Sequence, residues 1–175
     1  FDCSLATHAL DTCILSLVIA VEIGLDETAQ AQLGTGALLH DAGYARLPRN
    51  LVRRRGVCDE RERVLLQQHP AFGTALITEA AGFDGAVTRI VAEHHEREDG
   101  TGFPSGLKQD GISTLAMNVG IVDWYDGMVN RRGGRAAMLP YDAVQRLFVA
   151  GQQGRLKKSL VEIVIRSIGI YPIGS

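Results

Sequence analysis

Apolar segments with helical spacing run along the whole chain, and most of them end at Gly or Pro. The first covers residues 3–23 and ends at Gly24, and the second runs from Asp26 to about Ala42, before Gly43. The sequence has no convincing alternation of apolar and polar residues between hairpin turns, which is the pattern of β-strands. The sequence therefore predicts an all-α fold.

Capping and breaking residues mark the later helices. They are expected to begin near Asp59, Pro70, Asp84, Ser113, Pro140 and Ser159. Asp59 with Glu62, and Ser159 with Glu162, have the spacing of a capping box. The helix that begins at Asp59 is expected to end at His69-Pro70. Loops rich in Gly, Pro or Arg are expected at 43–58, 96–112 and 130–139.

Length and charge limit the class of protein. The 175 residues suffice for one domain with a sizeable core, so we expect 1–175 to form a single domain. Because the chain begins at Phe1 and ends at Gly174-Ser175, we expect this domain to come from a longer regulatory protein. A net charge of -2 argues against a nucleic-acid polymer as partner.

Cysteine usage and hydropathy indicate a cytoplasmic location. Cys3, Cys13 and Cys58 are odd in number and lack CxxC spacing, so we expect free thiols in a reducing compartment. The most apolar run, 13–21, is far shorter than the roughly 20 residues that span a bilayer, so no membrane span is expected. The sequence does not specify an oligomeric state.

Five histidines lie within or at the ends of the predicted helices: His8, His40, His69, His94 and His95. Asp41 follows His40 directly, while Asp123 and Asp126 share one face of an otherwise apolar helix. Burying such groups is costly unless they find partners. Imidazole and carboxylate ligands suit Zn, Fe, Mn or Co, and a carboxylate can bridge two ions. The pattern favours a metal centre.

Taken singly, these residues have simpler explanations. A His-Asp dipeptide such as His40-Asp41 often occurs by chance, and His8 alone fits a buried polar residue with ordinary partners. His94-His95 fits a solvated helix end, where the helix dipole favours a cation. Asp126 fits a contact with a backbone group. Only their joint occurrence favours a metal site.

Four motifs occur in order along the chain: LLHDAGYARLP, QQHP, HHEREDGTGFP and VDWYDGM. Together they resemble the HD-GYP branch of the HD-domain metal-dependent phosphohydrolases. The resemblance extends over nearly the whole chain, and the segment from His94 to Gly102 is its most specific part. It implies a helical bundle around a central metal centre and hydrolysis of the bacterial messenger cyclic di-GMP.

The resemblance also implies a set of site residues. One divalent ion would be held by His8, His40, Asp41 and Asp123. The second ion would be held by Asp41, His69, His94 and His95. Asp41 would bridge the ions and act in catalysis, with Asp126 as a nearby helper. Glu96 and Asp99 are expected to order the loop or orient the imidazoles.

The resemblance further places Arg132, Arg135 and Tyr44 at the substrate, with the two arginines on its phosphate. Three positions depart from the family pattern. Tyr44 stands where Lys is usual, and Gly102-Phe103-Pro104 lacks the hydroxyl of the usual Tyr. Ser4 stands where some members have a Glu that helps to hold a third ion, so two ions are expected. These departures bear on activity more than on the fold.

The function expected from the resemblance is hydrolysis of cyclic di-GMP to pGpG, GMP or both. Two transition-metal ions, Fe or Mn first and otherwise Zn, Co or Ni, would activate a hydroxide for in-line attack. One alternative is a weak or inactive relative that acts as a cyclic di-GMP sensor or protein-interaction module. The Gly102-Phe103-Pro104 loop is then the candidate contact for a protein partner. Another alternative is an HD phosphohydrolase of a different nucleotide.

Overall fold

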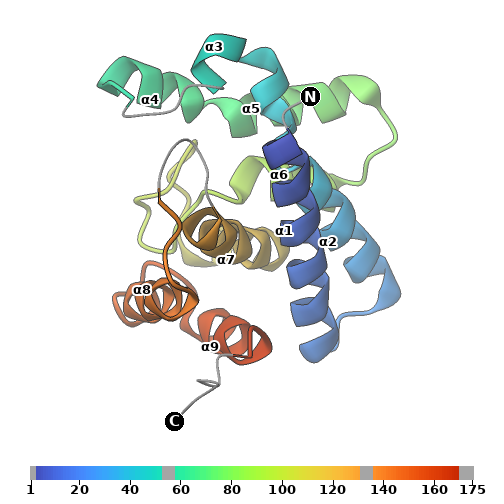
Figure 1. Cartoon of the computed structure of the whole chain (residues 1–175). Helices are drawn as coiled ribbons and strands as arrows, with labels where there is room; N and C mark the ends of the chain where they lie inside the picture. Colours follow the sequence, from blue (N-terminus) through green and yellow to red (C-terminus); the bar gives the residue numbers. More distant parts are fainter. Residues whose placement is uncertain (1–2, 53–57, 131–135, 170–175) are drawn as a thin grey trace.

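The chain folds into helices joined by short connections (Figure 1). A computed structural model describes residues 3–52, 58–130 and 136–169, although not the side chains of residues 3 and 4. The α-helices are α1 (Cys3–Glu22), α2 (Glu27–Leu39), α3 (Arg49–Val52), α4 (Glu60–Leu66), α5 (His69–Ala80), α6 (Gly85–Glu93), α7 (Thr114–Val129), α8 (Pro140–Gln152) and α9 (Lys158–Ser167). Two short 3-10 helices are η1 (Ala42–Arg46) and η2 (Gln109–Gly111). No strand occurs in the described ranges, and the all-α prediction is confirmed.

Helix α7 is the centre of the bundle, with α1, α2, α6, α8 and α9 packed against it (Figure 1). On one side, Ile121 joins Leu147 of α8 and Val161 of α9 in a buried cluster. On another side, Val119 packs with Leu33 of α2 in a second cluster. A helix that is apolar on most faces has to be buried in this way. Its few acidic side chains are therefore enclosed by the bundle.

Three of the predicted N-caps are confirmed. The Asp26 carboxylate accepts a hydrogen bond from the Ala29 amide, and Asp84 accepts one from the Ala86 amide. Asp59 and Glu62 form the predicted capping box at the start of α4. Each cap satisfies amides that lack partners within the first helical turn.

The capping box predicted for Ser159 and Glu162 is wrong. Ser159 lies inside α9, whose N-cap is Lys157, and no side chain caps this helix. The chain turns at Gly154, which has a φ of 70°, and then buries Leu156. Starting the helix directly after that point directs its apolar face into the core, so packing overrides the capping signal.

Helix ends near the histidines differ from the predictions. Helix α2 ends at Leu39 and the chain tightens into η1, whereas the sequence predicted one helix to about Ala42. His69 opens α5 and does not close the helix before it, because Pro70 fits the first turn of a helix. The predicted loop at 43–58 contains η1 and α3. His40, His69, His94 and His95 therefore lie at helix ends, next to sharp turns, whereas His8 lies inside α1.

Two glycines allow these ends to pack closely. A Cβ atom on Gly43 would lie 1.9 Å from the carbonyl oxygen of His69, and one on Gly120 would lie 2.1 Å from that of His94. Both distances are far below van der Waals contact. The backbone at each histidine is thus seated directly against another element, η1 for His69 and α7 for His94.

Helix α1 is long and apolar enough to cross a membrane by length and composition alone. Its segment Leu5–Glu22 has a mean hydropathy of 1.6, a longer apolar window than the run at 13–21. In the structure, however, α1 packs against α2, α7 and α9, and its polar residues His8, Thr12 and Ser16 are buried. Burial of these polar side chains against other helices fits a core helix better than a lipid-facing one.

Because the His94 backbone packs directly against Gly120, alanine substitutions at two glycines of α7 should affect stability differently. We expect Gly120→Ala to lower the free energy of unfolding by about 3 kcal/mol, because the added methyl group overpacks the contact with His94. Gly127→Ala is the control, since a Cβ there has nothing within 4 Å. It should leave stability unchanged or raise it by up to about 1 kcal/mol. Urea denaturation in the presence of a metal chelator measures the free energy of unfolding of both variants. Equal values for the two would contradict the close packing of Gly120 against His94.

Candidate metal centre

Two pairs of buried histidines face each other across the bundle. His8 of α1 and His40, directly after α2, have their Nε2 atoms 3.1 Å apart. His69 at the start of α5 and His94, directly after α6, have theirs 3.2 Å apart. All of these side chains are at most 2% exposed. Helices far apart in the sequence thus bring four imidazoles together.

Backbone hydrogen bonds fix the tautomers of three of these rings. The Nδ1 atoms of His40, His69 and His94 lie 2.6, 2.8 and 2.9 Å from the carbonyl oxygen three residues earlier in the chain. A carbonyl oxygen can only accept, so each Nδ1 carries the proton. In the neutral form of each ring, Nε2 then presents a lone pair to the interior.

A cation between His69 and His94 would satisfy both of their lone pairs. Burial lowers the pKa of His69, takes the pKa of His94 well below its usual range, and lowers the pKa of neighbouring His95 to about 3. These rings are therefore neutral near pH 7, and two bare lone pairs would repel at 3.2 Å. Two nitrogens that each lie about 2.1 Å from one ion are about 3.0–3.4 Å apart at ordinary coordination angles. The observed separation fits such an ion.

Asp41 lies between the two histidine pairs. Its Oδ1 is 3.4 Å from Nε2 of His69, and its Oδ2 is 3.5 Å from Nε2 of His40. Ligand atoms of Asp41, His69, His94 and His95 all lie within 4.8 Å of one another. The same holds for those of His8, His40 and Asp41. One carboxylate thus belongs to both candidate ligand sets.

Asp123 of α7 has a similar position. Its Oδ1 lies 3.0 Å from Nε2 of His8 and 3.8 Å from Nε2 of His40, while its Oδ2 lies 3.7 Å from Nδ1 of His95. Burial acts to raise the pKa of Asp123, but the hydrogen bond with His8 and the nearby imidazoles hold it well below its usual range. The group is a carboxylate, and it supplies negative charge to both sides of the centre.

Asp126 lies behind His8. Its Oδ2 is 2.5 Å from Nδ1 of His8, and its Oδ1 accepts a hydrogen bond from the Asn130 side chain. A carboxylate on the outer nitrogen of an imidazole fixes the ring orientation and makes it a stronger ligand. The contact is one that a helper residue would make, because it positions His8.

Two aromatic rings cover the second histidine group. Tyr44 stacks on His69, with ring centroids 4.3 Å apart and planes 12° apart. Phe103 packs on His95, with centroids 4.5 Å apart. From the sequence, Tyr44 is notable only as a replacement for Lys and Phe103 only for its missing hydroxyl, and neither ring contact was predicted. No spacing in the sequence indicates them.

The loop after His95 is held by its own acids. Glu96 accepts hydrogen bonds from the amides of Ser105 and Leu107, at 2.7 and 2.9 Å. Asp99 accepts from the amide and hydroxyl of Thr101. Within the described residues neither acid hydrogen-bonds to an imidazole. Both order the loop, which is the first of the two roles expected of them.

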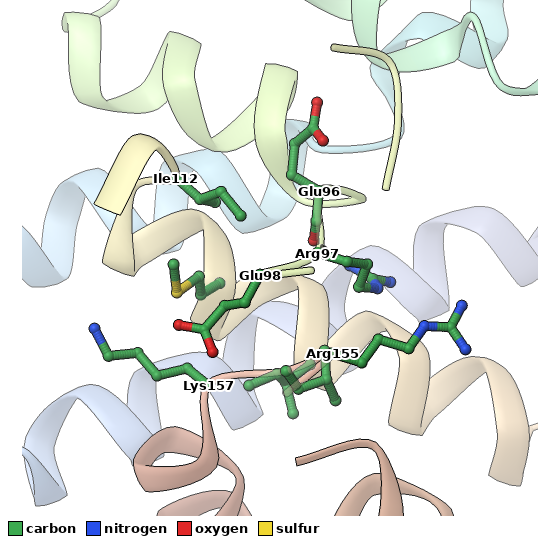
Figure 2. Close-up of a pocket in the computed structure, with 9 residues that line it drawn as sticks. Glu96, Arg97, Glu98, Ile112, Arg155 and Lys157 are labelled. Atoms are coloured by element: carbon green, nitrogen blue, oxygen red, sulfur yellow. Dashed lines mark hydrogen bonds between the residues drawn. The ribbon is translucent and has the colours of Figure 1, made fainter. Parts of the chain in front are cut away.

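Arg97 is a partly buried residue that no pattern in the sequence indicated. Its guanidinium donates to the carbonyls of His94 and Glu96, at 3.1 and 2.8 Å, and burial lowers its pKa. It also lies 5.7 Å from the ring centroid of Trp124, which Arg155 approaches to 5.4 Å. Figure 2 shows the side chains of Arg97 and Arg155 near each other, while that of Glu96 points away. Arg97 thus fixes the turn that carries His94 and His95.

Arg132 and Arg135 lie outside the described residues, as does the side chain of Ser4. Their predicted roles at the substrate and in limiting the ion count stay predictions.

Comparison with known proteins matches residues 5–157 to the HD domain family. The chain belongs to this family. The HD domain is 29% identical over 168 residues to a cyclic di-GMP phosphodiesterase of Pseudomonas aeruginosa, across 96% of this chain and 40% of that relative. It is 29% identical over 133 residues to 3'3'-cGAMP-specific phosphodiesterase 3 of Vibrio cholerae, across 76% of this chain and 29% of that relative.

A solved structure has the same fold as this HD domain. It is an HDG"Y"P protein from Bdellovibrio bacteriovorus, with a TM-score of 0.78 and 24% identity across 94% of this chain and 52% of that one. The resemblance to HD-GYP proteins found in the sequence is confirmed. The chain spans less than half the length of the two curated relatives described above.

The contact between Asp126 and His8 predicts weaker metal binding when it is lost. We expect Asp126→Ala to weaken the affinity for Mn²⁺ by about 10- to 100-fold, because His8 loses the partner that orients it. Asp126→Asn should lose less, since its amide oxygen can still accept from Nδ1. Competition with a chelator measures the affinity, and Asp110→Ala, an exposed acid on η2, is the control. An Asp126→Ala protein with wild-type affinity would contradict the positioning role.

Proposed function

We propose that this HD domain is a metal-dependent phosphodiesterase that hydrolyses cyclic di-GMP to pGpG, with further cleavage to GMP. The observation that carries the proposal is the pair of lone pairs that His69 and His94 present to each other at 3.2 Å, beside a carboxylate, Asp41, that also faces His40. The family and the activity named for the Pseudomonas aeruginosa relative support it.

The chain's own residues would hold two ions. His8, His40, Asp41 and Asp123 would hold one, and Asp41, His69, His94 and His95 the other. Divalent ions, when bound, supply Lewis acidity toward a phosphoryl oxygen and make water more acidic. Asp126 would keep His8 oriented, and Tyr44 would keep water from one face of His69. Nitrogen and oxygen ligands of this kind suit Fe or Mn, and Zn, Co or Ni otherwise.

A second candidate substrate is another cyclic dinucleotide. The relative named as a 3'3'-cGAMP-specific phosphodiesterase favours it, because that protein is also 29% identical to this chain, over 133 residues compared with 168 for the cyclic di-GMP enzyme. Substrate contacts from Tyr44, Arg132 and Arg135 stay predictions, as does a cytoplasmic location. A protein partner at Gly102-Phe103-Pro104 also stays a prediction, although Phe103 already packs on His95.

The test is turnover of a panel of cyclic dinucleotides by protein purified without oxygen, with the metal content of the same sample measured. We expect the wild type to hydrolyse cyclic di-GMP. Asp41→Asn should reduce turnover by at least about 100-fold, because the amide loses the charge that both ligand sets share. Circular dichroism checks that the variant keeps its helices.

Two results would contradict the proposal. A metal-loaded wild type that binds cyclic di-GMP without cleaving any dinucleotide of the panel would instead support a sensor. Full activity in Asp41→Asn would mean that the shared carboxylate is not part of the reaction centre.

A further inference from the structure

A cavity of about 540 Å³ opens beside Asp41, between α1, the end of α2, η1 and α3. Its size is that of a pocket for a ligand larger than a single phosphate. Small and apolar side chains form most of the wall, among them Ala6, Ala9 and Leu38. An apolar wall that reaches a candidate metal ligand suits a substrate with flat, weakly polar parts and a reactive anionic group.

Arg49, at the start of α3, is the one cation among the described residues that line this cavity. It is exposed, and no described residue forms an ion pair with it, Asp41 included. Arg46, three residues earlier, instead pairs with Glu79 of α5 and does not line the cavity. The two arginines therefore differ, because Arg46 forms an ion pair within the protein while Arg49 lines the cavity.

We infer that Arg49 binds the second phosphate of a cyclic dinucleotide, the one that is not being cleaved; this rests on the proposed function. A cyclic dinucleotide has two phosphodiester groups on one ring. With one of them at the ligand sets around Asp41, the other lies away from the centre and needs a cation of its own. Arg49 shares the cavity with Asp41 but makes no ion pair with it, as a separate second subsite requires.

Arginine suits this role because its planar guanidinium can give two parallel hydrogen bonds to a phosphate. The contact would select for substrates with two phosphates in one ring over simple phosphodiesters. It would also act mainly on binding, because the second phosphate does not change charge during cleavage of the first.

The test compares kinetics of wild-type, Arg49→Ala, Arg49→Lys and Arg46→Ala proteins. We expect Arg49→Ala to raise KM for cyclic di-GMP by about 10- to 100-fold, the scale of a charge-assisted hydrogen bond, with kcat within about threefold. Arg49→Lys should recover part of the loss. Arg46→Ala should keep the wild-type KM. Cleavage of bis(p-nitrophenyl) phosphate, which has one phosphate, should be the same in wild-type and Arg49→Ala proteins.

Failure of the Arg49 subsite can be told apart from failure of the proposed phosphodiesterase activity. A wild-type enzyme that cleaves cyclic di-GMP while Arg49→Ala keeps its KM would overturn the inference alone. An equal loss with bis(p-nitrophenyl) phosphate would also overturn it, since Arg49 would then act on the phosphate being cleaved.

If the wild type proves inactive, calorimetry can still measure the affinity of the protein for cyclic di-GMP in the presence of a metal chelator. Affinity that falls with Arg49→Ala but not with Arg46→Ala would support the Arg49 subsite although the proposed activity had failed. Binding that does not depend on Arg49, or no binding at all, would overturn the subsite.

Discussion

The lone pairs that His69 and His94 direct at each other limit how the surrounding helix ends can be arranged. Two neutral imidazoles would not stay buried with their Nε2 atoms 3.2 Å apart unless the protein holds them there or a cation binds between them. The chain does hold them: backbone carbonyls fix both Nδ1 atoms, and Gly43 and Gly120 seat both backbones against neighbouring elements. The fold is thus organised to keep a ligand set in place.

The sequence predicted much of this arrangement. Helical periodicity and Asp caps at Asp26, Asp59 and Asp84 located most helices, because local hydrogen bonds determine those ends. The structure also brings the predicted histidines together with Asp41 and Asp123. Motif spacing sufficed there, since metal-philic side chains on apolar helices have few other reasons to occur together.

What the sequence did not predict depends on contacts between distant segments. The stacking of Tyr44 on His69 and the position of Arg97 over the Trp124 ring follow from how η1, α6 and α7 pack, and no local pattern encodes them. The start of α9 shows the same limit, because burial of Leu156 decides it in place of the Ser159 signal. No sequence pattern predicted a role for Arg49 either, because that role depends on the cavity that Arg49 shares with Asp41.

Anomalous diffraction from crystals grown with Mn²⁺ or Fe²⁺ tests the metal centre most directly. We expect two peaks about 3.5–4 Å apart on either side of the Asp41 carboxylate. One peak should lie between His69 and His94, and the other beside His8 and His40. The absence of a peak between His69 and His94 in metal-loaded crystals would contradict the proposed metal centre, and a third strong peak near Ser4 would contradict the two-ion assignment.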